Sequence, residues 1–174
     1  MYVFGGYDGS YRSDFHKYNT LTQTWSLVPA TGRVPRARYR ATCVVHSGCM
    51  VVFGGHDGTR HLNDVYSFDF AASIWSSLNT TGPSPVPRDS HVACVHGRSM
   101  YVFGGSTGAS MNDFFELRLD TCRWQPVLAG RGVGDPQGQP GHRFCHVGVV
   151  ERDSMFVFGG YDGSNRLNDF WEFR

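Results

Sequence analysis

The sequence predicts an all-β protein in which one small antiparallel sheet is repeated about three and a half times. A run of aromatic and β-branched residues that ends in Gly-Gly occurs four times, at steps of 49, 50 and 55 residues. A turn sequence, Asp-Gly in three copies, follows each glycine pair, and a tryptophan lies 19 or 20 residues beyond three of the pairs. Repeats of this length are typical of β-propellers and other arrays. We therefore expect a partial β-propeller across residues 1–174.

Composition excludes several classes of protein. Apolar residues make up 40% and aromatic residues 14% of the chain, which excludes a disordered polypeptide. The 16 basic and 15 acidic residues give a net charge of +1, so the one-sided charge of nucleic-acid or membrane-surface binding is missing. We recognise no signal peptide and no apolar run long enough to span a bilayer.

The five cysteines are an odd number and include no Cys-x-x-Cys pair. Three of them, Cys43, Cys94 and Cys145, lie within apolar strand-like runs. Buried free thiols in a reducing compartment explain this pattern better than a disulfide framework. The sequence therefore predicts a cytoplasmic protein.

The run that ends in Gly-Gly is expected to be a buried strand. Glycine allows a backbone conformation or a close approach that other residues do not, so we interpret the pairs as structural. The four pairs are Gly5-Gly6, Gly54-Gly55, Gly104-Gly105 and Gly159-Gly160.

An aspartate opens the second strand of each unit, at Asp14, Asp64, Asp113 and Asp169. In the second copy the side chains alternate, so that Val65 and Tyr66 begin two opposite faces. The third strand carries the tryptophan, which we interpret as a core wedge between neighbouring sheets. The three tryptophans are Trp25, Trp75 and Trp124.

A loop rich in glycine and proline follows, and a fourth strand then returns to the next glycine pair. These fourth strands are expected at Tyr39–His46, Ser90–His96 and Phe144–Val150. Four antiparallel strands per unit, with no helical pattern, form the blade of a propeller.

Together, Tyr-Val-Phe-Gly-Gly, Asp-Gly, Asn-Asp, Tyr and Trp resemble the kelch repeat over essentially the whole chain, which implies a kelch-type β-propeller. Blades of that family carry strands a to d from the innermost to the outermost. The chain then reads b-c-d, a-b-c-d, a-b-c-d and a-b-c, with blade parts at 1–28, 38–78, 88–128 and 143–174. We therefore expect neighbouring blades or domains to be missing from this chain. The tail Gly160–Trp171 resembles the leucine-zipper-like regulator branch of the family.

Strand direction predicts where a binding surface lies. In an antiparallel blade the b–c and d–a loops share one face, and function tends to collect on such long loops. Each d–a loop ends in an arginine, 16 residues before the next glycine pair, and the b–c loops add further arginines and aromatic residues. The candidate partner-binding residues are Arg38, Arg88, Arg143, Arg12, Arg60, Arg166, Tyr7, His56 and Tyr161.

Arginines interleaved with aromatic rings suit an acidic or phosphorylated peptide, because a guanidinium forms bidentate pairs with carboxylates and phosphates. The kelch resemblance implies the same, since this face commonly recruits partner proteins and its arginines contact acidic motifs in some family members. The alternative is structural: an arginine that recurs once per repeat pairs with Asp14, Asp64, Asp113 or Asp169 to hold the loops. Both interpretations remain open at this point.

Enzymatic functions find little support in the sequence. Gly130–Gly134 faintly resembles a phosphate-binding loop, but Pro136 and Pro140 prevent the helix that such a site needs. His142 and His146 share one side of a strand without further converging ligands, so no metal and no cofactor is expected. The kelch enzymes that resemble galactose oxidase need a crosslinked Cys–Tyr pair, which cannot be identified here.

The sequence therefore predicts a non-enzymatic protein–protein interaction module. A substrate-adaptor role for a ubiquitin ligase is one hypothesis, by analogy with kelch proteins that carry BTB domains. The alternatives are a kelch-type metalloenzyme and a cytoskeletal or scaffold protein.

Overall fold

The computed structural model describes residues 1–128 and 138–174, so the expected Gly130–Gly134 loop lies outside the described residues.

Four separate sheets, here named blades 1 to 4, follow one another along the chain. Blade 1 contains β1 (Tyr2–Tyr7), β2 (Tyr11–Asn19) and β3 (Thr24–Leu27). Blade 2 contains β5 (Thr42–His46), β6 (Cys49–Phe53), β7 (Val65–Asp69) and β8 (Ile74–Leu78), with β4 (Thr31–Gly32) at its edge. Blade 3 contains β9 (Val92–His96), β10 (Ser99–Ser106), β11 (Ser110–Arg118) and β12 (Arg123–Pro126). Blade 4 contains β13 (Val147–Glu151), β14 (Ser154–Tyr161) and β15 (Arg166–Phe173).

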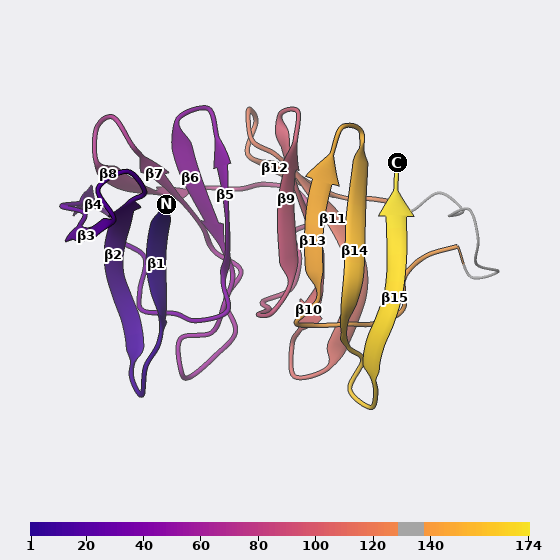
Figure 1. Ribbon diagram of the computed structural model, residues 1–174. Coiled ribbons are helices and arrows are strands. Elements are labelled where there is room, and N and C mark those ends of the chain that lie inside the picture. Colours follow the sequence, from indigo (N-terminus) through magenta and orange to yellow (C-terminus); the bar gives the residue numbers. More distant parts are fainter. Residues whose placement is uncertain (129–137) are drawn as a thin grey trace.

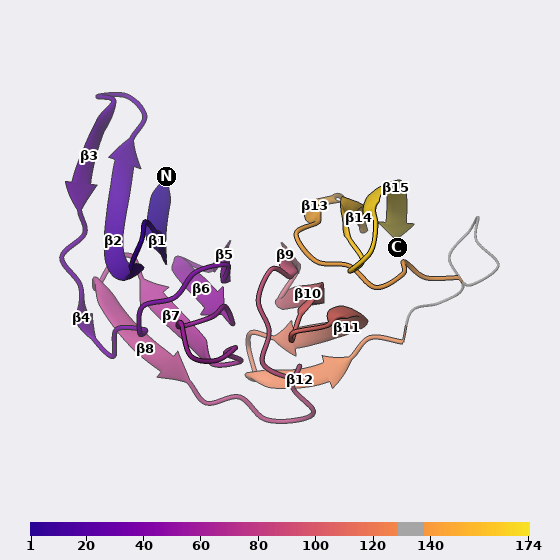
Figure 2. The same ribbon diagram turned by 90° about the horizontal axis from the view of Figure 1, so that it is seen from below.

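The blades stand side by side with their strands roughly parallel to one axis (Figure 1). Seen along that axis they form an arc, with β5, β9 and β13 innermost and β3, β8 and β12 toward the outside (Figure 2). The principal strands of each blade pair antiparallel, and the four sheets do not close into a ring. The predicted partial propeller, with the strand order b-c-d, a-b-c-d, a-b-c-d and a-b-c, is confirmed.

β4 differs from the expected all-antiparallel pattern, because it pairs parallel to the outer strand β8 of the next blade. The loop that leaves blade 1 must cross to the inside of blade 2, and its peptide groups find hydrogen-bond partners on the way. Thr81 makes the equivalent parallel bridge to Arg123 of blade 3. Gly32 has φ of +84°, and a Cβ there would lie 2.2 Å from the Trp75 carbonyl oxygen, so the crossing requires glycine.

The glycine pairs form the joints between blades. The Gly55 N–H donates to the Arg88 carbonyl oxygen of the next blade at 2.9 Å, and Gly6 and Gly105 make the same bond to Arg38 and Arg143. A Cβ on Gly54 would lie 2.8 Å from the Arg88 carbonyl oxygen. Two adjacent blades can approach this closely only because no side chain lies between them.

The core lies between the blades. Each blade turns one face, here called its outgoing face, toward the following blade, and its incoming face toward the preceding one. The Trp75 ring, on the incoming face of blade 2, lies 5.1 Å from Phe4 and 5.4 Å from Phe15 of blade 1. The Trp124 ring of blade 3 lies 5.1 Å from Phe53 of blade 2. Both tryptophans are fully buried wedges.

Trp25 differs from the other two tryptophans and from the expectation that it lies in the core. It is 55% exposed, because none of the four blades in the described residues packs against the incoming face of blade 1. Its ring contacts Tyr18 of its own sheet at 5.0 Å. The same residue type at the same repeat position is thus buried only where a neighbouring blade covers it.

All five cysteines are free, but only Cys94 is buried. The expectation of buried thiols is wrong for Cys43 and Cys145, which are exposed. Cys43 alternates with the buried Val44 on the innermost strand of blade 2. The Cys43 side chain therefore faces blade 1, which has no innermost strand to cover it.

Across residues 1–128 and 138–174, no helix has the length and apolar character needed to cross a membrane.

Candidate partner-binding face

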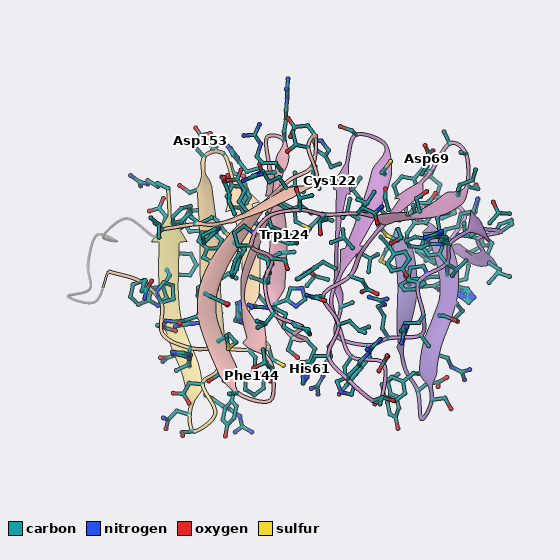
Figure 3. All side chains as sticks on the ribbon, turned by 180° about the vertical axis from the view of Figure 1, so that it is seen from behind. His61, Asp69, Cys122, Trp124, Phe144 and Asp153 are labelled. Atoms are coloured by element: carbon teal, nitrogen blue, oxygen red, sulfur yellow. The ribbon has the colours of Figure 1, made fainter. Side chains whose placement is uncertain are left out.

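The b–c and d–a loops lie together on one side of the molecule, here called the loop face. Isolated β-bridges join the end of each d–a loop to the start of the next b–c loop: Tyr39 to His56, Asp89 to Ser106 and Phe144 to Tyr161. Figure 3 shows His61 and Phe144 at this edge, whereas Asp69, Cys122 and Asp153 lie at the opposite edge. The shared face deduced from strand direction is therefore present in the structure.

The three arginines that recur in the d–a loops point inward. The side chains of Arg38, Arg88 and Arg143 are at most 1% exposed. The Arg88 guanidinium donates from Nη2 to Asp113 Oδ2 at 2.7 Å and from Nη1 to the Gly104 carbonyl oxygen at 2.9 Å, while Nε donates to the Val86 carbonyl oxygen at 3.1 Å. The Arg88 guanidinium thus ties the d–a loop to two neighbouring strands of blade 3.

The same fork is repeated in the neighbouring blades, where Arg38 binds Asp64 and Arg143 binds Asp169. Hydrogen bonds from Arg143 outweigh the effect of burial and, with the Trp171 indole N–H, lower the pKa of Asp169 to about 2. These guanidiniums are occupied and shielded, so they cannot contact a partner in this arrangement. The geometry supports the structural interpretation that the sequence left open, and not the partner-binding one.

The arginines of the b–c loops are accessible. The Arg12 side chain is half exposed and pairs with Asp8 at 2.6 Å, and Arg60 and Arg166 are exposed. Tyr161 lies at the surface, with its ring 5.4 Å from Phe144. These residues are placed where a partner could reach them, although in different blades.

The loop face between blades 1 and 2 carries a cluster of five rings, here called the aromatic patch: Tyr7, Tyr11, Tyr39, His56 and His61. Tyr11 lies 5.1 Å from Tyr7 and 5.4 Å from Tyr39, and His56 lies 6.0 Å from Tyr39 and 4.9 Å from His61. Burial and the neighbouring tyrosines raise the pKa of Tyr11, so it remains a neutral hydrogen-bonding group. The patch joins the two predicted residues Tyr7 and His56 in one continuous surface.

Charged groups surround the aromatic patch. The Arg40 guanidinium lies 4.8 Å from the centre of the Tyr39 ring, a cation–π geometry. His61 Nε2 lies 3.3 Å from Asp89 Oδ2. Arg36 Nη1 donates to Asp57 Oδ2 at 3.0 Å, which ties the d–a loop to the b–c loop beside it.

Asp57 holds this part of the loop face together. Burial raises the pKa of its carboxyl group, but the backbone N–H groups of Arg60 and Thr59 and the Arg36 guanidinium outweigh that effect and lower the pKa to about 2. The carboxylate therefore stays ionised at neutral pH. Its fixed charge orients the loop that carries His56.

Sequence reasoning did not identify Tyr11, Tyr39, Arg40 or His61 as candidate site residues. None of them was found because none recurs: the positions equivalent to Arg40 carry Ser90 and Cys145. The available signal was the alternating run Arg36–Arg40, in which the middle arginine is buried and Arg36 and Arg40 are exposed.

Two histidines at the start of inner strands, His91 and His146, are buried. His91 Nε2 lies 2.6 Å from the Thr42 hydroxyl, whereas the other His91 nitrogen and both nitrogens of His146 have no hydrogen-bond partner among the described residues. Burial, together with the charges of Arg88 and His146, lowers the pKa of His91 to about 3. Burial and Arg143 lower the pKa of His146 to about 4.

These shifts predict a loss of stability in mild acid. Below pH 6.5, the ordinary pKa of histidine, His91 and His146 become protonated in the unfolded chain. In the folded chain both stay neutral down to about pH 4. The free energy of unfolding should therefore fall by about 1.4 kcal/mol per pH unit for each of the two histidines as pH decreases through this range. Urea denaturation at pH 7.5, 6 and 5 measures the slope, and His146→Leu should make it shallower. An unchanged slope in that variant would contradict the prediction.

No group of three or more histidine, cysteine, aspartate or glutamate side chains that could hold a metal ion occurs within the two described segments.

Comparisons with known proteins agree with the repeat and the fold. The KLHDC2/KLHL20/DRC7 Kelch-repeats domain matches residues 1–132. The chain is 34% identical over 173 residues to the leucine-zipper-like transcriptional regulator 1 homolog of Drosophila melanogaster, which covers 98% of this chain and 13% of that protein. It is 28% identical over 182 residues to Kelch domain-containing protein 10 of Homo sapiens, covering 99% of this chain and 41% of that protein.

One shorter match is to an enzyme. The chain is 39% identical over 72 residues to the N-(sulfonatooxy)prop-2-enimidothioate sulfolyase of Thlaspi arvense, covering 39% of this chain and 21% of that protein. The chain thus spans less than half the length of each of these relatives. The family match extends over most of the chain and coincides with the repeats and blades described above. The chain belongs to the kelch-repeat family.

Proposed function

We propose that the loop face binds an acidic or phosphorylated segment of a partner protein, and that the chain acts as a non-enzymatic interaction module. Kelch-repeat membership supports a protein–protein interaction module in general. The observation that carries the finer proposal is the aromatic patch with Arg40 stacked on Tyr39. It is a continuous surface of rings with an accessible guanidinium at its edge.

The chemistry of this surface suits an extended peptide that carries negative charge. Aromatic rings offer a large apolar contact area at a low cost in side-chain entropy. A guanidinium over the face of a ring makes no hydrogen bond to it, so its N–H groups stay available for a carboxylate or phosphate. Arg12 and Arg60 lie in the b–c loops of the same two blades, where each is exposed beside an aspartate, Asp8 and Asp57 respectively.

The wider role proposed here is that of an adaptor, which holds a substrate protein for a ubiquitin ligase in the cytoplasm. The support for it is the resemblance to kelch proteins that carry BTB domains. In this proposal, neighbouring blades or domains complete the propeller and connect it to the ligase.

The test measures binding of fluorescein-labelled acidic decapeptides, with and without phosphoserine, by fluorescence anisotropy. Arg40→Gln should weaken binding at least fivefold, because it removes the cation beside the patch. The matched control is Arg98→Gln, since the Arg98 side chain is 78% exposed in a turn at the opposite edge. Peptides in which glutamine replaces glutamate should not bind. Equal effects of the two variants, or no binding of any acidic peptide at 100 μM, would contradict the proposal.

A further inference from the structure

One histidine of the loop face is held by a buried aspartate. His61, in the b–c loop of blade 2, places Nε2 3.3 Å from Oδ2 of Asp89, which belongs to the d–a loop that leads into blade 3. The Asp89 side chain is only 7% exposed, and its other oxygen, Oδ1, accepts a hydrogen bond from the Ser90 hydroxyl at 2.7 Å. The His61 side chain is 25% exposed and lies at the loop face (Figure 3). A fixed, buried carboxylate is thus joined to a ring that a partner can reach.

This pair lies at the joint between two complete blades. Blades 2 and 3 each have all four strands from a to d, so both sides of the joint are present in the structure. Backbone bridges hold the two loops, with His61 opposite His56 in blade 2 and Asp89 opposite Ser106 in blade 3. The His61 ring also lies 4.9 Å from the His56 ring, at an angle of 84°. The pair is therefore continuous with the rest of the aromatic patch.

The other repeats carry different residue types at these two positions. The repeat position of His61 is occupied by Tyr11, Ser110 and Arg166, and that of Asp89 by Tyr39 and Phe144. At the joint between blades 1 and 2 the corresponding side chains are two tyrosine rings, 5.4 Å apart. A contact that every blade needed would recur, as the buried arginine–aspartate fork does. The His61–Asp89 pair therefore serves this one place on the loop face.

The carboxylate determines which nitrogen of His61 carries a proton. A carboxylate only accepts hydrogen bonds, so Nε2, beside Asp89, is the nitrogen that keeps its proton. In the neutral ring Nδ1 is then an acceptor, and it becomes a donor only when the ring takes up a second proton. His56 differs, because its Nδ1 accepts from the Gly58 N–H at 3.0 Å, which leaves Nε2–H as a donor in the neutral ring.

We propose that His61 donates from Nδ1–H to an acidic group of the partner segment, so that binding of the segment is coupled to the uptake of a proton. This inference rests on the proposed function and identifies a residue that makes it depend on pH. Neutral His61 would turn a lone pair toward the anion, which is unfavourable. Protonated His61 donates on both sides, to Asp89 and to the ligand. The affinity for an acidic peptide therefore increases as the pH falls.

Several other charged or titratable groups lie around the pair. They are His56, Asp57 and Arg60 of the same b–c loop, Tyr39 and Arg40 of the preceding d–a loop, and Arg88 beside Asp89. Asp57, with its pKa of about 2, stays ionised between pH 6 and pH 8. Arginine and tyrosine side chains do not ordinarily change charge in this range. Protonation of His56 would break its hydrogen bond from Gly58. Substitution of His61 separates its contribution from that of His56.

The test measures the affinity of a glutamate-rich decapeptide at pH 6 and at pH 8 by the fluorescence anisotropy of a rhodamine label. Glutamate carboxylates are ionised at both pH values, so a change in affinity comes from the protein. The wild-type chain should bind the peptide about threefold more tightly, or better, at pH 6. Isothermal titration calorimetry at pH 7 in phosphate and in Tris buffers should show that protons are taken up on binding.

Three variants assign the effect to the pair. His61→Gln keeps a donor toward Asp89 but cannot be protonated, so it should bind weakly and equally at both pH values. Asp89→Asn offers an N–H group to Nε2, which allows the proton of neutral His61 to lie on Nδ1. Its affinity should therefore vary less with pH than that of the wild type. His96→Gln is the matched control, since His96 Nε2 lies 3.6 Å from the exposed Asp153 at the opposite edge, and it should behave as the wild type.

Circular dichroism at both pH values checks that each variant is folded. An affinity that is equal at pH 6 and pH 8 in the wild type, or a pH dependence that His61→Gln retains, overturns this inference and leaves the proposed function in place. Failure of the acidic peptide to bind at either pH overturns both.

Discussion

Replacing Arg88 with alanine is expected to lower the free energy of unfolding by about 3–5 kcal/mol. The Arg88 guanidinium is fully buried, and its loss leaves Asp113 and the Gly104 carbonyl oxygen without their donor. The Asp113 side chain is itself 31% exposed, so the loss comes mainly from the missing guanidinium hydrogen bonds and from the cavity that the buried Arg88 side chain leaves. Urea denaturation followed by tryptophan fluorescence gives the difference directly.

Two further variants test whether the loss of stability is specific to the buried Arg88 guanidinium. Arg60→Ala should change stability by no more than about 0.5 kcal/mol, because the Arg60 side chain is 66% exposed. Arg88→Lys should recover little of the loss, since one ammonium group cannot reproduce the planar fork that reaches both Asp113 oxygens. If Arg88→Ala proves as stable as Arg60→Ala, the buried fork does not hold the blade together.

Trp124→Ala should destabilise the protein by a similar amount, about 3–5 kcal/mol. The ring is fully buried between blades 2 and 3, where it lies 5.1 Å from Phe53 and 6.5 Å from Phe115. Its removal takes apolar area out of the core and leaves a cavity between two rigid sheets. Thermal and urea unfolding of the purified variant measure the loss.

The comparison with Trp25→Ala separates burial from residue type. Trp25 occupies the equivalent repeat position, but it is largely exposed and contacts Tyr18 of its own sheet. Its replacement should cost about 1 kcal/mol or less. Equal losses for the two variants would show that the tryptophan stabilises its own sheet rather than the interface between blades.

Much of the architecture could be predicted because the same sequence pattern occurs four times along the chain. Four copies of the glycine-ended strand set the period, and the turn and tryptophan positions set the strand order within each blade. Strand direction then determines that the two sets of long loops share one face. All of this depends on local patterns and on the alternation of antiparallel strands, which neighbouring blades do not alter.

The site was harder to predict, and the recurring arginines show why. A residue that returns at the same repeat position does so because the inside of every blade needs it, as Arg88 needs Asp113. The aromatic patch that we propose as a binding surface lies at one place, and the repeat positions of Tyr39 and Arg40 carry other residue types in the other blades, such as Ser90 and Cys145 in place of Arg40. Periodicity therefore identified the supports of the loops and passed over most of the aromatic patch.

The sequence by itself determined the repeat, the strand order and the loops that share a face, because each depends on residues close together in the chain. Only the tertiary structure decided which side chains are buried. Burial in a propeller depends on the next blade, as the buried Trp75 and the exposed Trp25 demonstrate. It also decided that Arg38 points into its blade while Arg40 faces outward, because Arg38 pairs with Asp64, which lies far along the chain, whereas Arg40 lies over the ring of its neighbour Tyr39 at the surface.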